Sequence, residues 1–413
     1  MHHTTNNRLL LLAHAWCPRG GVGTRRWSKL AKYLSQNGVH VDVVTSQYPY
    51  ADKVNWCHDI SNNPLIVAHP TKGGYPPYLL KPARGFVTKA GSRILKRTTH
   101  PIDAAQGWSS TMHRKCTELL NKHKYDAVIL TVGPFSPLLK LPQLKEQFPD
   151  VCFVVDYRDP WSYYQKASDA SSPAGIVARE YAALQQMDQV WVTTTDHQKA
   201  YADKFPLIAD KLRVLSNGYD PEDITGVQES KPSEDYWVAI HPGSLAGKRQ
   251  TSLFFLLSAL SKNDLPILRE KFRIHLYTNT AISVETVPND LQAAYDHYVT
   301  ILHPVPAEEM LQLISNASFA IVFDDPAHTL TLPSKTFEYL ALDKKILYIG
   351  PEKEIFQQLY AEGHYQARVN EASVSEMLIR LAKEEVSGKT KSGSDLKEQF
   401  RIDRLTRQLL SFF

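Results

Sequence analysis

Lys335 and Glu338 have the chemistry to bind a ligand that carries both phosphate and hydroxyl groups. Pro333 is typical of a helix start, and the free N–H groups of a first helical turn bind phosphate, to which the Lys335 ammonium adds positive charge. A carboxylate can accept two hydrogen bonds from vicinal hydroxyls, as on a ribose, so Glu338 suits that role. The alternative interpretation of Glu338 is an ordinary exposed helix residue.

A second basic segment, residues 241–249, combines a glycine with two adjacent cations. Gly243 lets a ligand approach the backbone, and Lys248 and Arg249 suit the charge and geometry of a diphosphate. A plain basic turn is the alternative.

Glycines also mark residues 18–25, where Gly21 and Gly23 precede a helical pattern. Such glycines let the backbone approach a ligand, and the start of the following helix attracts anions. The spacing departs from the strict dinucleotide fingerprint, so it supports NAD binding only weakly. A structural turn without a ligand is the alternative.

Asp156, Arg158 and Asp159 form the candidate catalytic group, next to Trp161. Two carboxylates around an arginine, beside an aromatic ring, can bind sugar hydroxyls or transfer a proton. The alternative is a local salt bridge with Trp161 as part of the core.

Short apolar runs that predict β-strands precede these segments. The expected strands are residues 9–13, 39–45, 125–132, 151–157 and 189–194 in the first half, and 236–241, 272–277, 299–303, 319–323 and 345–349 in the second. Helical patterns separate the runs, which predicts parallel sheets covered on both faces, with ligands beyond the carboxyl ends of the strands.

We therefore predict an α/β fold with two consecutive doubly wound, Rossmann-like domains, residues 1–210 and 211–386. Residues 387–413 are expected to form a polar linker and an amphipathic C-terminal helix that packs back on the other domain.

Composition and charge set limits on partners and location. The chain has 413 residues without a run of about 18 apolar residues, and its apolar run near the N-terminus is too short for a signal peptide, so we expect a cytoplasmic protein. A net charge of +4 is small for this length and does not predict nucleic-acid binding. The four cysteines are scattered, which predicts reduced thiols and no metal site.

Residues 71–100 are basic, with seven Lys or Arg residues, no Asp or Glu, and apolar and aromatic residues between the cations. Such a segment can lie on an anionic membrane surface. A solvated loop that happens to be basic is an equally good interpretation.

Taken together, these motifs resemble the retaining GT-B glycosyltransferases of the family-4 type, most of all those that build bacterial surface polysaccharides. The resemblance runs along almost the whole chain, in the order and spacing of its motifs. It includes the turn at residues 18–25, residues 125–136, 156–161, 215–220 and 241–244, and residues 333–340.

The resemblance implies two domains with a cleft between them, the first facing the acceptor and the second holding a nucleotide sugar, UDP- or GDP-linked. Glu338 matches the family's ribose-binding glutamate, Lys335 with Lys248 or Arg249 its diphosphate-binding residues, and the loop around Val305 its base contact. It implies transfer to a saccharide or polyprenyl-linked acceptor, with retention and with neither a metal nor a cofactor.

Two positions depart from the family pattern. Leu330 stands eight residues before Glu338, where many relatives carry a first glutamate that contacts the donor sugar. Arg158-Asp159 stands where many relatives have His-Asp. A sugar-nucleotide epimerase of the same fold and a non-catalytic binding subunit are therefore the alternative functions.

Overall fold

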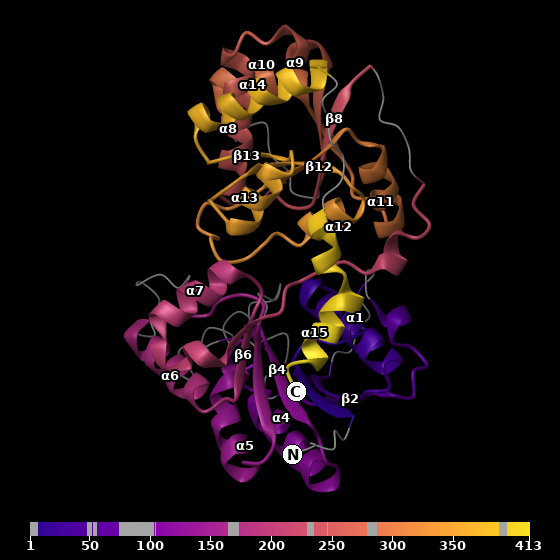
Figure 1. Cartoon of the computed structure of the whole chain (residues 1–413), viewed down its shortest axis with the longest axis vertical. Helices are drawn as coiled ribbons and strands as arrows, with labels where there is room; N and C mark the ends of the chain where they lie inside the picture. Colours follow the sequence, from indigo (N-terminus) through magenta and orange to yellow (C-terminus); the bar gives the residue numbers. More distant parts are fainter. Residues whose placement is uncertain are drawn as a thin grey trace, which may run out of the picture. The chain divides into compact units, whose positions relative to one another are not determined.

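The computed structural model describes residues 7–47, 52, 56–73, 103, 105–163, 173–228, 235–245, 247–278, 287–387 and 395–413. The chain divides into two compact units (Figure 1): Met1–Ser216 with Leu405–Phe413, and Asn217–Arg404. The division between Ser216 and Asn217 lies close to the boundary placed at residue 210 from the sequence. Most of the basic segment 71–100 lies outside the described residues.

The first unit is built on a seven-stranded sheet with the order β3-β2-β1-β4-β5-β6-β7, in which all neighbouring strands are parallel. The strands are β1 (Arg8–Ala13), β2 (His40–Ser46), β3 (Ile66–Thr71), β4 (Ala127–Val132), β5 (Cys152–Tyr157), β6 (Gln189–Val192) and β7 (Leu212–Val214). Its helices include α1 (Val22–Gln36), α4 (Ser109–Lys122), α5 (Leu141–Gln147), α6 (Pro173–Gln185) and α7 (Thr195–Lys204). The order reverses between β1 and β4, where doubly wound sheets bind ligands.

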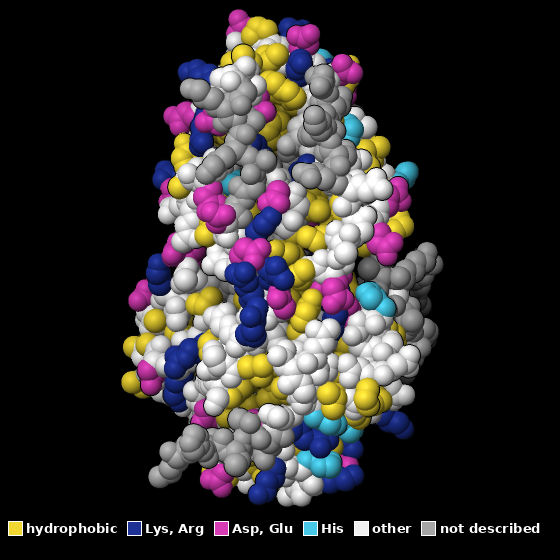
Figure 2. All heavy atoms as spheres, turned by 45° about the vertical axis from the view of Figure 1, so that its right-hand side comes forward, with side chains coloured by type: hydrophobic (Ala, Val, Ile, Leu, Met, Phe, Trp, Pro, Cys, Tyr) yellow, Lys and Arg dark blue, Asp and Glu magenta, His cyan; other side chains and the backbone are white. Residues whose placement is uncertain are grey.

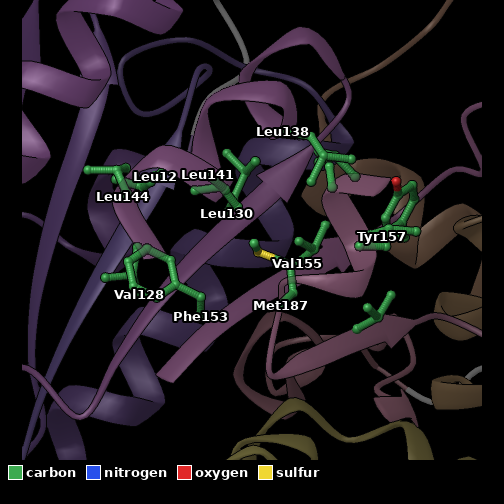
Figure 3. Close-up of a cluster of buried hydrophobic side chains, with 14 of the residues drawn as sticks. Leu12, Val128, Leu130, Leu138, Leu141, Leu144, Phe153, Val155, Tyr157 and Met187 are labelled. Atoms are coloured by element: carbon green, nitrogen blue, oxygen red, sulfur yellow. The ribbon is translucent and has the colours of Figure 1, made fainter. Parts of the chain in front are cut away.

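The strands of this sheet carry nearly continuous apolar residues because helices cover it on both faces. Figure 3 shows one side of the resulting core, where side chains of β4 and β5 meet those of the following helices. Its residues include Val128, Leu130, Phe153, Val155, Leu138, Leu141, Leu144 and Met187, all at most 1% exposed. This packing fixes the carboxyl ends of β4 and β5, from which the candidate residues of the first unit extend.

The second unit repeats the architecture with a six-stranded parallel sheet, in the order β10-β9-β8-β11-β12-β13. Its strands are β8 (Trp237–Pro242), β9 (Phe272–Tyr277), β10 (Val299–Leu302), β11 (Phe319–Phe323), β12 (Lys345–Ile349) and β13 (Tyr365–Ala367). Its helices are α8 (Arg249–Lys262), α9 (Pro266–Lys271), α10 (Gln292–Tyr298), α11 (Ala307–Asn316), α12 (Lys335–Ala341), α13 (Glu354–Ala361) and α14 (Glu371–Ser387). Two parallel-sheet units of this kind confirm the predicted fold class.

The predicted C-terminal helix is α15 (Ile402–Leu410), and from Leu405 onward the chain is part of the first unit again. There the side chain of Gln189 donates a hydrogen bond to the carbonyl of Phe412. In the second unit, the backbone of Tyr219 forms hydrogen bonds with Phe400 and Ile402.

The prediction of four reduced cysteines is wrong for two of them. A disulfide joins Cys17 to Cys57, whose Cα atoms lie 5.5 Å apart although the residues are 40 positions apart in sequence. Folding of β1 and β2 brings the two segments together, which sequence spacing alone does not reveal. Cys116 and Cys152 are free thiols.

On the face presented in Figure 2, Lys and Arg side chains lie interspersed with Asp and Glu. Among the described residues, no helix combines the length and apolarity needed to cross a bilayer.

Candidate functional site

In the first unit, Arg158 joins three of the predicted motifs. Its guanidinium donates hydrogen bonds to the carbonyls of Val132, at 3.3 Å, and Gly133, at 2.6 Å, where β4 ends. The same group packs against Gly23, where an added Cβ would overlap it, and against Gly133, whose φ of +97° only glycine adopts readily. Topology therefore brings the glycine-rich turn after β1, the end of β4 and the turn after β5 together around one cation.

Arg158 and Asp159 differ in exposure from Asp156. Asp159 is exposed, and Arg158 is partly buried. Burial lowers the pKa of the Arg158 guanidinium, and the carboxylates of Asp159 and Asp156 partly offset this. Asp159 is therefore the more accessible of the two turn residues.

Asp156 is fully buried, with both carboxylate oxygens occupied. The Arg26 guanidinium donates to both oxygens, at 2.9 and 3.2 Å, and the indole N–H of Trp27 donates to one of them at 2.7 Å. Arg26 also donates to the carbonyls of Leu215, at 2.9 Å, and Ser216, at 2.7 Å. Asp156 thus links β5 to α1, and Arg26 links α1 to Leu215 and Ser216.

A buried carboxylate supports the turn that carries Arg158. Glu180, in α6, accepts hydrogen bonds from the hydroxyls of Tyr157, at 2.9 Å, and Tyr201, at 3.0 Å, and from the backbone N–H of Ser162, at 3.2 Å. The Tyr201 hydroxyl in turn accepts the backbone N–H of Trp161. Burial raises the pKa of Glu180 despite these donors. The sequence analysis missed Glu180, since nothing in the sequence of an amphipathic helix distinguishes it from a surface glutamate.

Asp103 was also missed. Its carboxylate accepts the backbone N–H groups of Phe135 and Ser136, at 2.6 and 2.8 Å, and so holds the loop after β4. It lies close enough to His14, at the end of β1, to raise the pKa of that imidazole, but burial dominates and lowers it to about 4. His14 is therefore neutral near neutral pH.

In the second unit, Lys335 is the centre of the predicted diphosphate site. Its ammonium donates to the carbonyl of Pro242 and lies 3.1 Å from Nε2 of His241. Nδ1 of His241 lies 2.9 Å from the carbonyl oxygen of Ile321. Because a carbonyl can only accept, Nδ1 carries the hydrogen, and Nε2 accepts a hydrogen bond from the Lys335 ammonium. Gly243 has a φ of +113°, and an added Cβ would lie 3.1 Å from the Lys335 ammonium. The turn after β8 and the start of α12 thus meet at this lysine.

The electrostatics of Lys335 suit an anion. Burial, and after it the charge of Arg249, lower the pKa of its ammonium to about 7, although Glu338 and Asp324 act in the opposite direction. Burial also lowers the pKa of His241 well below its ordinary value. Lys335 and Arg249 therefore repel each other in the ligand-free protein, a conflict that a bound diphosphate would relieve.

The remaining predicted residues lie around this centre. Glu338 is partly buried in α12, and Val305 is partly exposed in the loop between β10 and α11. Lys248 is the N-cap residue of α8, and Arg249 is the first residue of that helix. Gly21 holds the same N-cap position at α1, with a φ of +107°.

The carboxylate of Asp324, at the end of β11, is engaged inside the protein. This carboxylate forms a buried ion pair with Lys353 and lies 3.2 Å from the hydroxyl of Tyr348. Lys353 also donates to the carbonyl of Thr331, next to the buried Leu330. Lys353, which no sequence signal marked, thus anchors the loop in which many relatives carry their first glutamate.

Residues 19–223 match the model of Glycosyltransferase Family 4. No curated protein matches the chain in sequence.

Solved structures match over nearly the whole length. Sucrose-phosphate synthase from Thermosynechococcus elongatus is 15% identical with a TM-score of 0.64, covering 98% of each chain. HepE from Anabaena, in complex with UDP, is 12% identical with a TM-score of 0.62, covering 98% of this chain and 99% of its own. UDP-GlcNAc 2-epimerase from Methanocaldococcus jannaschii is 11% identical with a TM-score of 0.54, and the match covers 98% of this chain and 99% of the epimerase chain.

At these identities the structural likenesses establish the fold, and the family match over residues 19–223 is to a family of glycosyltransferases. The protein is a glycosyltransferase with the GT-B fold, and its residues 19–223 match Glycosyltransferase Family 4.

Proposed function

We propose that the second unit binds a nucleoside diphosphate sugar, UDP- or GDP-linked, and that the enzyme transfers its sugar to a saccharide or polyprenyl-linked acceptor with retention of configuration. Lys335 and Arg249, with Lys248, bind the diphosphate, Glu338 the ribose, and the loop around Val305 the base. Arg158 and Asp159 in the first unit contact the acceptor. Neither a metal nor a cofactor takes part, since these cations offset the charge of the departing diphosphate.

One observation carries the proposal: the Lys335 ammonium lies against Gly243, in range of the charges of Arg249 and Glu338. Partly buried cations of this kind are stabilised by a bound anion, and Glu338 is one helical turn away for the ribose hydroxyls. The complex of the Anabaena relative with UDP supports the same ligand class.

Asp156 acts in this proposal as a positioning residue, because its two oxygens are engaged by Arg26 and Trp27. It holds α1 and β5 so that Gly23 and Arg158 stay in contact. The chemistry is left to Arg158 and Asp159.

The biological setting belongs to the proposal as well. Transfer in surface-polysaccharide synthesis, in the cytoplasm, agrees with the sequence resemblance. Residues 71–100 would bring the enzyme to an anionic membrane where a lipid-linked acceptor resides.

The donor role is tested by a thermal-shift screen of nucleotide sugars, followed by calorimetry on the wild type and on Glu338→Ala. Glu270→Ala is the matched control, an exposed glutamate of α9 before β9. We expect Glu338→Ala to weaken binding of the selected donor at least tenfold, with an unchanged melting temperature. Equal affinity in Glu338→Ala and the wild type would refute the ribose contact.

Transfer is tested by incubating the enzyme with that donor, with and without a lipid-linked or saccharide acceptor. Formation of a glycosylated product only when acceptor is present supports the proposal. A new sugar nucleotide formed from donor alone would instead identify an epimerase, and binding without either product would identify a non-catalytic subunit.

A further inference from the structure

A cavity of about 260 Å³ opens at the carboxyl ends of β12 and β13, between α13 and α14. Neither Lys335, Glu338 nor the turn after β8 lines it, so it is separate from the residues assigned to the donor. Its lining is drawn entirely from the second unit, from residues 348 to 380.

Three tyrosines give the cavity its walls. Tyr348 and Tyr365 are buried, at 2% and 1% exposure, whereas Tyr360 is exposed at its mouth. The Tyr348 hydroxyl is already engaged, since it donates to the carbonyl of Pro351 at 2.7 Å. The Tyr348 ring is stacked on Phe356, whereas the exposed Tyr360 ring offers apolar surface of the kind that the C–H faces of a sugar ring cover.

Arg380, in α14, adds a guanidinium to the lining. Its Nε donates to Glu384 at 2.7 Å, and its guanidinium carbon lies 4.2 Å from the centre of the Tyr360 ring. One terminal nitrogen of this guanidinium is buried and has no hydrogen-bond partner among the described residues. Buried donors are nearly always paired, so a donor left unpaired in the lining of a cavity predicts an acceptor on a ligand.

The charges of the side chains that line the cavity do not favour an anionic ligand. Arg368 forms an ion pair with Glu352, and Arg380 with Glu384, so each cation is already balanced. Glu376 adds a further exposed carboxylate to the lining. Such a lining provides both donors and acceptors without excess positive charge, which suits a neutral polyhydroxylated ligand.

Size narrows the ligand further. At about 30 Å³ for each water molecule in the liquid, the cavity holds the equivalent of about nine waters. This space is of the size of one pyranose ring.

We propose that this cavity is a second carbohydrate site, which binds one neutral pyranose unit through a hydrogen bond from Arg380 and contact with the ring of Tyr360. The unit is supplied either as a free sugar or as part of a glycan chain. The site acts independently of the donor residues, so its failure would leave the proposed transferase function untouched.

The test uses saturation-transfer NMR on the full-length protein. The probes are methyl α-D-glucopyranoside, methyl α-D-mannopyranoside, methyl β-D-galactopyranoside and maltotriose. We expect at least one probe to bind the wild type and Arg380→Met to weaken that binding about tenfold or more, the worth of a hydrogen bond from a charged donor. Arg269→Met, which changes an exposed arginine of α9, should bind like the wild type.

Two further variants separate the outcomes. Tyr360→Ser changes an exposed side chain, so it tests the site even if Arg380→Met is unstable, and it should also weaken binding. Glu338→Ala should keep the glycoside signal while losing nucleotide binding.

Binding of the methyl glycosides shows that a free sugar is sufficient, and binding of maltotriose alone shows that the ligand is a glycan chain. The proposal is overturned if no probe binds, or if binding survives unchanged in both Arg380→Met and Tyr360→Ser.

Discussion

Donor affinity should fall steeply as the pH rises above 7, because the cation proposed to bind the diphosphate loses its proton there. The pKa of the Lys335 ammonium in the ligand-free protein is about 7, chiefly because of burial and the nearby Arg249. A bound diphosphate stabilises the ammonium and restores a pKa near the ordinary lysine value of about 10.4. Binding at pH 8 therefore requires uptake of nearly one proton.

The size of the effect follows from the protonated fraction of free Lys335. With a pKa of about 7, this fraction falls about 30-fold between pH 8 and pH 9.5, so the dissociation constant of the donor should rise about 30-fold, or about 2 kcal/mol. The phosphates of the ligand are fully ionised in this range and add nothing to the change.

Calorimetry at pH 8 in two buffers of different ionisation enthalpy measures proton uptake directly. We expect about 0.9 proton for each nucleotide bound by the wild type. Lys335→Met should bind more weakly, take up no proton and show no pH dependence in this range. Lys262→Gln, which changes an exposed lysine of α8, serves as control. Uptake of fewer than about 0.2 proton, or equal affinity at pH 8 and 9.5, would refute the assignment of Lys335.

Three other predictions concern the first unit. Asp156→Asn should lower the free energy of unfolding by about 3–5 kcal/mol in guanidinium titration, because it leaves a buried guanidinium without its counter-charge. Gly23→Ala should displace the Arg158 guanidinium and slow sugar transfer at least tenfold, while calorimetry shows unchanged nucleotide affinity in the second unit. Alkylation of the unfolded, unreduced protein should leave Cys17 and Cys57 unmodified, and prior reduction should expose both.

Each of these predictions has a control in the chain. Asp159→Asn changes an exposed carboxylate and should shift the free energy of unfolding by no more than about 0.5 kcal/mol. Gly226→Ala adds a methyl group in open space and should transfer sugar at the wild-type rate. Cys116 should be alkylated whether or not the protein is reduced. If a variant and its control give the same result, the role assigned to the corresponding contact is wrong.

The sequence predicted buried strands well because their apolar runs are continuous. β9, β11 and β12 begin and end at the predicted residues. β3 was missed because it is an edge strand with mostly half-exposed residues and contains Pro70, which suits an edge but weakens the strand signal. β13 has only three residues, too few for a periodic pattern.

The candidate residues were found from their types, but their environments depend on tertiary packing. Arg26 bonds Asp156 although the two residues are 130 positions apart in sequence. The pairing of β1, β4 and β5 brings them together, and local sequence does not show this. The contact of Gly23 with Arg158 has the same origin. Lys353 resembles a surface lysine in sequence, and only the closeness of β11 and β12 shows that it is buried against Asp324.

Hydrogen exchange on the full-length protein, with and without saturating UDP or GDP, tests the central claim most directly. Donor binding by the second unit predicts slower exchange in residues 241–249 and 335–340, with Glu338→Ala losing this protection at the same nucleotide concentration. Protection confined to residues 18–25 of the first unit, or no protection in any segment, would contradict it.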